Sequence, residues 1–412
     1  MKGILCNFPS LTGMRNQSEQ PRYELVWQAV TATLCRLVLN TARRFAYPFA
    51  PVLSRGLVVP LTAVTSLIAV NQATSILGIF FGPMADRLGY RRMMLAGLGT
   101  LALGMSAGGL LPFFAVVLAG LLLAGLGKTI FDPALQAYVG NRVPFSRRGM
   151  VIGVLEFSWA GSTLLGIPLL SLLIHRFGWR APFFMLGGFG LLGVAALMHV
   201  MPADTRRRHD RGDAATLRRS WTDLWRSRAS LGMIGYAFFY SAANDNLFVV
   251  FGAWLEQAFG LSTIGVGIGA SIIGVAELMG EGLTASYADK MGLSRSVFLG
   301  LLFSAVCYGL LPLIAHSLLP ALIGLFVLFL VFEFTVVSSL SLSTELMPRS
   351  RATMMSFFYA AAGIGRMAGA LAGGFVWLKG GILATGIVSA GITSLAFISL
   401  TVGVRGWRSP EP

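Results

Sequence analysis

The sequence consists largely of long apolar runs, each about the length that a helix needs to cross a lipid bilayer. A membrane-spanning helix requires about 20 mostly apolar residues. Because backbone polar groups in lipid must bond within their own segment, helices are the expected form. Cut at charged or Gly/Pro turns, the runs predict twelve spans, at about 26–52, 60–82, 93–112, 114–140, 150–174, 181–201, 230–257, 262–285, 296–316, 319–344, 354–378 and 381–404.

The composition supports an all-α membrane protein. The 412 residues are 55% hydrophobic and 12% charged, whereas soluble proteins carry about 25% charged residues. Mean hydropathy is +0.73. Fifty glycines are typical of packed transmembrane helices, in which small residues allow close approach.

The basic residues are distributed unequally between the two predicted membrane faces. Of the 32 Lys and Arg residues, 23 fall in the termini and loops of one face, four on the other face and five within spans. Positive charge favours the cytoplasmic side, which predicts cytoplasmic termini. The net charge of +15 therefore orients helices in a membrane and does not indicate nucleic acid as a partner.

Other kinds of chemistry lack the residue patterns that they need. No P-loop or nucleophile–base pair is present, and the histidines are isolated, so we predict no enzyme activity, no metal site and no cofactor. Residues 1–24 lack the apolar core of a cleavable signal, so the first span is expected to stay in the membrane. Three cysteines lie too far apart for a metal or disulfide pattern: Cys6, Cys35 and Cys307.

A charged loop at residues 82–92 lies between the second and third spans and recurs later in the chain. Asp289-Lys290-Met291-Gly292 repeats Asp86-Arg87-Leu88-Gly89 at an offset of 203 residues. The loop resembles the loop 2–3 signature of the major facilitator superfamily, G-x-x-x-D-R-x-G-R-[RK], interrupted by Tyr90. The matching residues are Gly82, Asp86, Arg87, Gly89, Arg91 and Arg92.

The resemblance implies two related six-helix bundles and a secondary transporter that works by alternating access. The long polar segment near residue 215 divides the halves and contains an amphipathic stretch suited to a membrane surface. We expect a monomer in the bilayer of a bacterial inner membrane. The expected domains are a tail (1–25), a first bundle (26–201), a basic linker (202–229), a second bundle (230–404) and a tail (405–412).

The resemblance also assigns a gating role to the charged loops. In the family, the signature aspartate faces the start of the eleventh helix, where the helix dipole favours an anion. The alternative interpretation is that these charges only set topology. The predicted gating residues are Gly82, Asp86, Arg87, Gly89, Arg91, Asp289 and Lys290.

Ionisable side chains inside the first half are candidate site residues, because charges within a membrane are costly. Asn40 and Arg43 lie on one face of the first span, and Arg36, near its end, is expected to extend outward to the headgroups. Lys128 and Asp132 are spaced to pair within the fourth span. A cation at this depth needs a carboxylate partner or an anionic substrate.

The fifth span carries Glu156 and Trp159, followed by Gly161, Gly166 and Pro168. This pattern resembles a degenerate antiporter signature, G-x-x-x-G-P-x-x-G-G, and implies close packing against the eighth span and a bend. The stretch 127–149 resembles bacterial efflux permeases, although the arginine typical of drug antiporters in the fourth span is not found at its expected place.

The second half supplies candidate proton carriers, since a carboxyl in a low-dielectric site can exchange a proton near neutral pH. Asp245 and Glu277 are the first choices, ahead of Asp132 and Glu156; fixed salt bridges are the alternative. The predicted substrate-binding residues of the whole chain are Asn40, Arg43, Lys128, Trp159, Tyr240, Asn244, Glu333 and Arg366.

These patterns predict a carrier of a small organic solute, with protons as the coupling ion and export favoured over uptake. An importer and a non-transporting membrane scaffold or sensor remain as alternatives. Buried charges argue against the scaffold, because an inert bundle would be more stable without them.

Overall fold

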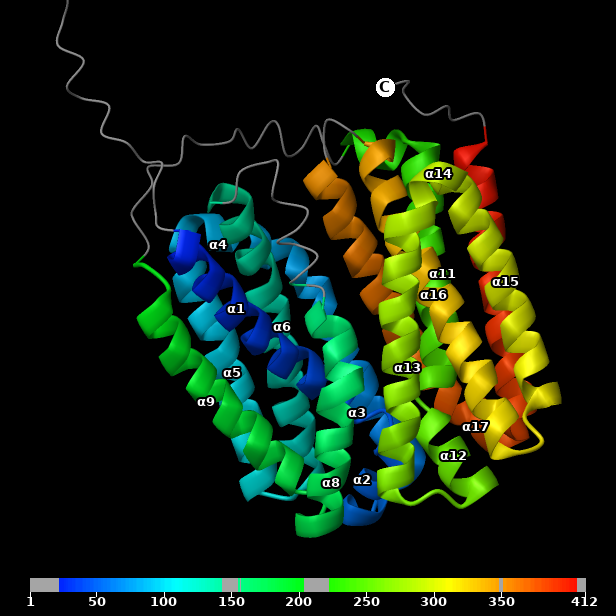
Figure 1. Ribbon diagram of the computed structural model, residues 1–412, viewed down its shortest axis with the longest axis horizontal. Helices are drawn as coiled ribbons and strands as arrows, with labels where there is room; N and C mark the ends of the chain where they lie inside the picture. Colours follow the sequence, from blue (N-terminus) through cyan, green and yellow to red (C-terminus); the bar gives the residue numbers. More distant parts are fainter. Residues whose placement is uncertain (1–21, 143–154, 156, 204–221, 348–350, 406–412) are drawn as a thin grey trace, which may run out of the picture.

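The computed structural model describes residues 22–142, 155, 157–203, 222–347 and 351–405. In this part of the chain all regular elements are helices. They form two groups that lie side by side, the first half of the chain in one and the second half in the other (Figure 1). The arrangement of two helical bundles, one from each half of the chain, that was predicted from the sequence is therefore present.

The helices of the first half follow the predicted spans. In chain order they are α1 (Arg22–Arg44), α2 (Ala50–Leu57), α3 (Leu61–Ala73), the short 3₁₀ helix η1 (Thr74–Leu77), α4 (Gly78–Leu88), α5 (Tyr90–Leu110), α6 (Phe114–Arg142), the π-helix η2 (Ser162–Gly166), α8 (Ile167–Phe177) and α9 (Ala181–Val200).

The second half contains two very long helices. Its elements are α11 (Arg228–Phe248), α12 (Phe251–Phe259), α13 (Thr263–Leu283), the π-helix η3 (Thr284–Ala288), α14 (Asp289–Met291), α15 (Leu293–Ile314), α16 (Leu318–Leu346) and α17 (Arg351–Val404). Gly380 and Gly381 have non-helical dihedral angles and divide α17 into two helices.

Nine helices among the described residues are long and apolar enough to cross a membrane. In this count α17 is a single helix. Helices α1 and α11 are not among the nine, and both carry several buried polar side chains. The protein is a multi-pass membrane protein, and the count of twelve spans stays a prediction.

Two helices are interrupted near the centre of the molecule. The backbone between α1 and α2 turns at residues 45–49, where Pro48 lacks the N–H that a continuous helix needs. The backbone between α11 and α12 turns at residues 249–250, without a proline. Both breaks bring backbone and side chains of the first half against the second half.

A glycine with positive φ forms the turn in both copies of the repeated segment. Gly89 (φ 102°) separates α4 from α5, and Gly292 (φ 87°) separates α14 from α15. A positive φ of this kind is unfavourable for residues with a Cβ. The two glycines lie 203 residues apart, so the internal repeat predicted from the sequence extends to backbone conformation.

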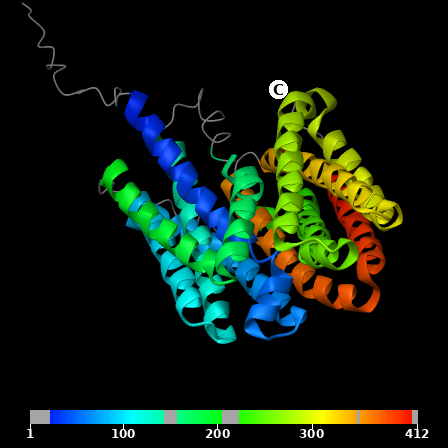
Figure 2. The same ribbon diagram turned by 60° about the horizontal axis from the view of Figure 1, so that its bottom comes forward.

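The halves meet through α8, η2, α3, η1 and α2 of the first half and α13, α17 and α12 of the second. The start of α1 and the end of α17 lie at one end of the molecule, which we call the terminal face. The turns that carry α2 and α12 lie at the other end, the distal face (Figure 1). A second view also separates the two groups of helices (Figure 2).

The linker between the halves is described from residue 222 onward. Residues 222–226 are helical, with Leu224 buried against the second half and Trp225 exposed beside Phe357 at 6.0 Å between ring centroids. The rest of the predicted amphipathic stretch lies outside the described residues. The predicted domain boundaries therefore remain predictions.

Candidate functional site

Buried polar side chains from both halves meet near the breaks of α1 and α11. We call this group the central polar cluster. Its members are Arg36, Asn40, Arg43, Arg44, Tyr47, Gln72, Lys128, Asp132, Trp159, Thr163, Asp245, Glu277 and Arg366.

Polar residues of α1 occupy successive turns of one helix face. Asn40 donates to Ser158 Oγ at 3.1 Å. Arg43 donates to Gln72 Oε1 at 2.7 and 2.9 Å and to Ser75 Oγ. The helical repeat explains this placement, because residues three or four apart lie on the same side. The first span therefore directs Asn40 and Arg43 toward its neighbours η1 and the fifth span.

Arg44 forms an ion pair with Glu277 across the interface between the halves. The two guanidinium nitrogens donate to the carboxylate at 2.5 and 3.2 Å, and both side chains are almost fully buried. Thr163, within the π-helix η2, donates to the same carboxylate at 3.0 Å. The Arg44 guanidinium also lies 4.3 Å from the ring centroid of Trp159.

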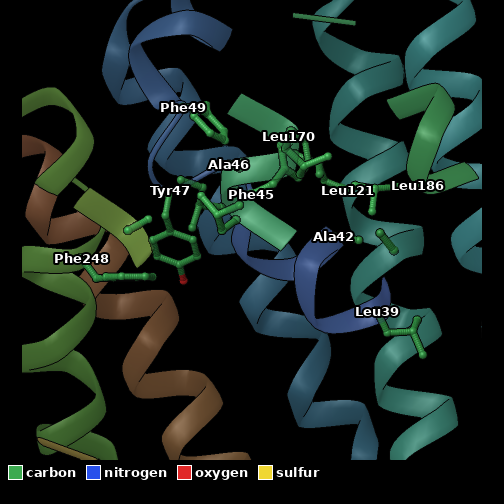
Figure 3. Close-up of a cluster of buried hydrophobic side chains, with 14 of the residues drawn as sticks. Leu39, Ala42, Phe45, Ala46, Tyr47, Phe49, Leu121, Leu170, Leu186 and Phe248 are labelled. Carbon is green, nitrogen blue, oxygen red and sulfur yellow. The ribbon is translucent and has the colours of Figure 1, made fainter. Parts of the chain in front are cut away.

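Tyr47 makes the second polar contact between the halves. Its hydroxyl donates to Asp245 Oδ1 and accepts a hydrogen bond from Gln72 Nε2 at 2.7 Å. Arg366 Nε lies 3.9 Å from the other carboxylate oxygen of Asp245. The Tyr47 ring packs on Phe248 with centroids 4.8 Å apart (Figure 3). The break after α1 thus places one side chain in both a polar and an apolar contact.

A third acid, Asp132, is held within the first half. It accepts from Lys128 at 2.5 Å and from Arg36 Nε at 3.3 Å. The predicted pairing of Lys128 with Asp132 is confirmed. The outward orientation expected of Arg36 is wrong, because this side chain turns inward, where Asp132 and the Leu155 carbonyl supply acceptors.

The remaining predicted substrate residues occupy different positions. Asn244 is buried on α11, one residue before Asp245. Tyr240 lies within the second half, where its hydroxyl bonds to Ser304 Oγ at 2.7 Å and its ring stacks on Phe332. Glu333 is buried on α16 and interacts electrostatically with Glu277. Glu156 lies outside the described residues.

The gating prediction is only partly covered by the described side chains. The side chains of Gly82, Asp86, Arg87 and Asp289 lie outside them, although their backbones belong to α4 and α14. The other members with described contacts are Arg91, which donates to the Met198 carbonyl at 2.6 Å, and Lys290, 5.5 Å from the Tyr287 ring.

The site residues predicted from the sequence did not include Arg36, Arg44, Tyr47, Gln72 or Thr163. Tyr47 precedes a proline in a span already rich in polar residues, and Gln72 interrupts an apolar run, so both carry a detectable signal. Thr163 carries no such signal, because a hydroxyl that bonds its own helix is common in apolar spans.

An additional ion pair joins the halves at the distal face, where Arg55 lies 2.5 Å from Glu256. The Arg55 side chain is 61% exposed, and exposed pairs contribute about 0–1 kcal/mol. We therefore expect Glu256→Gln to change the thermal unfolding midpoint of the purified protein only slightly, and less at high salt. A decrease in the unfolding midpoint as large as that of a variant that breaks a buried ion pair would contradict this expectation.

Comparisons with known proteins identify the family. The sequence profile of the Major Facilitator Superfamily matches residues 32–244 and 233–412. The chain therefore belongs to the major facilitator superfamily, a family of membrane transporters and not a class of enzyme. The first match covers the first half and most of α11, and the second match covers the remainder of the second half.

Individual relatives agree with this assignment. The chain is 25% identical to the uncharacterized MFS-type transporter YwfA of Bacillus subtilis (strain 168) over 325 residues, 77% of each protein. It is 34% identical to the multidrug resistance protein MdtH of Shigella flexneri over 99 residues, 24% of this chain and 25% of the relative.

A solved structure shares the fold. It is that of a bacterial homologue of the human lysosomal transporter Spinster in an inward-facing and unoccupied conformation. The TM-score is 0.75 at 15% sequence identity, and the match covers 96% of this chain and all of the other.

Proposed function

We propose that this protein exports a small organic solute by alternating access, driven by exchange with protons. Two buried contacts carry the proposal: Arg44 with Glu277, and Tyr47 with Asp245. Each joins a basic or hydroxyl group of the first half to an acid of the second half. A change of charge on either acid would therefore act directly on the contact between the halves.

The physical basis is the strength of charge interactions in a low-dielectric interior. Protonation of Glu277 removes the negative charge that holds Arg44, and a buried arginine without its partner is strongly unfavourable. The halves then separate at this point, which exposes the arginine to water. Loss of the proton restores the ion pair and favours contact. Asp245 acts in the same way through Tyr47 and Arg366.

Gating at the terminal face is assigned to the repeated loops. In this proposal Asp86 faces the start of α17, while Arg87 and Arg91 contact acceptors of their own half. Gly82 lies within α4 and Gly89 forms the turn to α5, while Asp289 and Lys290 of α14 are the corresponding residues of the second half. The left-handed backbone of Gly89 and Gly292 supports an equivalent role for both loops.

The orientation of the protein in the membrane is inferred from the excess of Lys and Arg in the loops of the terminal face. We place this face in the cytoplasm of a bacterium, with the protein a monomer in the inner membrane. Export is favoured over uptake by the antiporter-like fifth span and by the partial similarity to a protein named for multidrug resistance.

Proteoliposome flux tests the proposal. Vesicles are loaded with fluorescein, an anion, or ethidium, a cation, and a pH gradient is imposed. We expect the wild-type protein to move at least one probe, and Glu277→Gln and Asp245→Asn to slow the gradient-driven flux at least tenfold while probe exchange without a gradient persists.

Glu256→Gln serves as a matched control, because it removes a partly exposed acid whose ion pair with an exposed arginine also joins the halves. Full gradient-driven flux in both test variants would overturn the proton assignment. A wild-type protein that accelerates the flux of neither probe would contradict the proposed transport of organic solutes.

A further inference from the structure

Three cationic side chains surround the ring of Trp159. Arg44 lies 4.3 Å from the ring centroid, Arg366 lies 5.3 Å away and Lys128 lies 5.8 Å away. They come from α1, α17 and α6, so both halves of the molecule contribute. Cations at such distances interact favourably with an indole ring, but their mutual repulsion must be offset by negative charge.

Among the described residues, the acids of the central polar cluster are fewer than its cations. Asp132 serves Arg36 and Lys128 together, Glu277 serves Arg44, and Asp245 serves Arg366 from 3.9 Å. Within the described part of the chain, Glu333 forms no ion pair within 4.0 Å. Among the described members of the cluster, these three acids face five cations: Arg36, Arg43, Arg44, Lys128 and Arg366.

Arg43 is the cation without an acid. Its guanidinium is buried and bonds to neutral acceptors, the Gln72 side chain and carbonyl and the Ser75 hydroxyl, and no carboxylate of the described residues lies within 4.0 Å. It is also close enough to Arg366 for the two to repel each other. Buried charges are normally paired. One further anion beside Arg43 would therefore improve the balance of charges in the cluster.

Arg366 and Trp159 are partly exposed, whereas the arginines that α1 contributes to the cluster are buried. The Arg366 side chain is 25% exposed, whereas the Arg44 side chain, already paired with Glu277, is 6% exposed. Trp159 itself is half-buried. An incoming molecule therefore meets an arginine fork and an indole face together. The planar guanidinium suits a carboxylate, which it can bind through two parallel hydrogen bonds.

We propose that the transported solute is an organic anion, whose carboxylate binds Arg43 and Arg366 and whose flat apolar body packs on Trp159. This inference rests on the proposed transport function and specifies its substrate class. The anion supplies the negative charge that the cluster lacks, and the ring contact selects aromatic over purely aliphatic acids.

Binding of a matched series of naphthyl compounds tests the inference without any need for transport. The probes are 2-naphthoate, 2-naphthamide and 2-naphthylmethylammonium, which share a ring system and differ in charge. Titration calorimetry uses the full-length protein in detergent. We expect naphthoate to bind at least tenfold more tightly than the amide, and the ammonium probe to bind more weakly still.

Variants assign the contacts. Arg43→Gln and Arg366→Gln should each weaken naphthoate binding at least tenfold and leave amide binding unchanged, while Arg366→Lys should retain part of the affinity. Trp159→Leu should weaken both compounds. Arg176→Gln is the control, because Arg176 is an exposed arginine of α8 outside the cluster and its loss should change neither affinity.

Size-exclusion profiles matching the wild type establish that each variant is folded. Absence of naphthoate binding by the wild type, ammonium binding as tight as naphthoate binding, or unchanged naphthoate affinity in Arg366→Gln would each overturn the inference. The proposed function fails separately: naphthoate that binds as expected but is not moved by a pH gradient contradicts proton-coupled transport and leaves the anion site intact.

Discussion

Replacing Glu277 with arginine is expected to separate the two halves at the distal face. The new guanidinium would lie beside Arg44 in a buried position where the wild type has an ion pair. Loss of one partner of a buried pair costs about 3–5 kcal/mol, which shifts a two-state equilibrium by a factor of about 10² to nearly 10⁴. Like-charge repulsion adds to this shift.

Spin labels report the separation. Val58, in the turn after α2, and Gln257, on α12, are exposed positions on opposite halves of the distal face. Labelled as cysteines in a background without the three native cysteines, they should show a longer distance distribution in Glu277→Arg than in the wild type. Pulsed electron–electron double resonance measures that distribution of distances between the two labels.

The charge-swapped variant Arg44→Glu/Glu277→Arg is the control, because it restores an ion pair of reversed polarity. We expect its distance distribution to return toward that of the wild type. A distribution unchanged by Glu277→Arg, or one that the swap does not restore, would show that this pair does not hold the halves together.

The fold was largely predictable because its signals are local. Apolar runs set the spans, the Lys379–Gly380 turn marks the division within α17, and Pro48 marks the break after α1. The break between α11 and α12 was not predicted, since residues 249–250 are valines within an apolar run. The helix breaks where the chain packs against the first half. Because neither valine disfavours a helix as proline does, the sequence near the break gives no sign of it.

Part of the membership of the site was predictable from the sequence, but the contacts between the two halves were not. Lys128 and Asp132 lie one helical turn apart, so their pairing follows from helix geometry. Arg44 and Glu277 are separated by 233 residues, and their contact depends on the register between two bundles. A single sequence holds no information on that register. Arg36 was assigned to the headgroups for a related reason, because its contact with Asp132 depends on how α1 packs against α6 within the first half.

Gly252 leads to a second large expected effect, at a close backbone contact between the two halves. A Cβ at this position on α12 would overlap the Pro48 carbonyl oxygen. Because the obstacle is backbone, no side-chain rotation relieves it, and overpacking of this kind costs typically 1–3 kcal/mol. We expect Gly252→Val to favour the state that is open at the distal face and to slow flux at least tenfold.

The matched control is Gly188→Val, the same substitution on α9, where a Cβ meets nothing within 4 Å. It should leave both flux and the distance between labels at Val58 and Gln257 unchanged. If alternating access requires the contact between Pro48 and Gly252, only Gly252→Val lengthens that distance and loses flux. Wild-type flux in Gly252→Val would mean that transport proceeds without closure at the distal face, and the proposed cycle would then lack one of its two states.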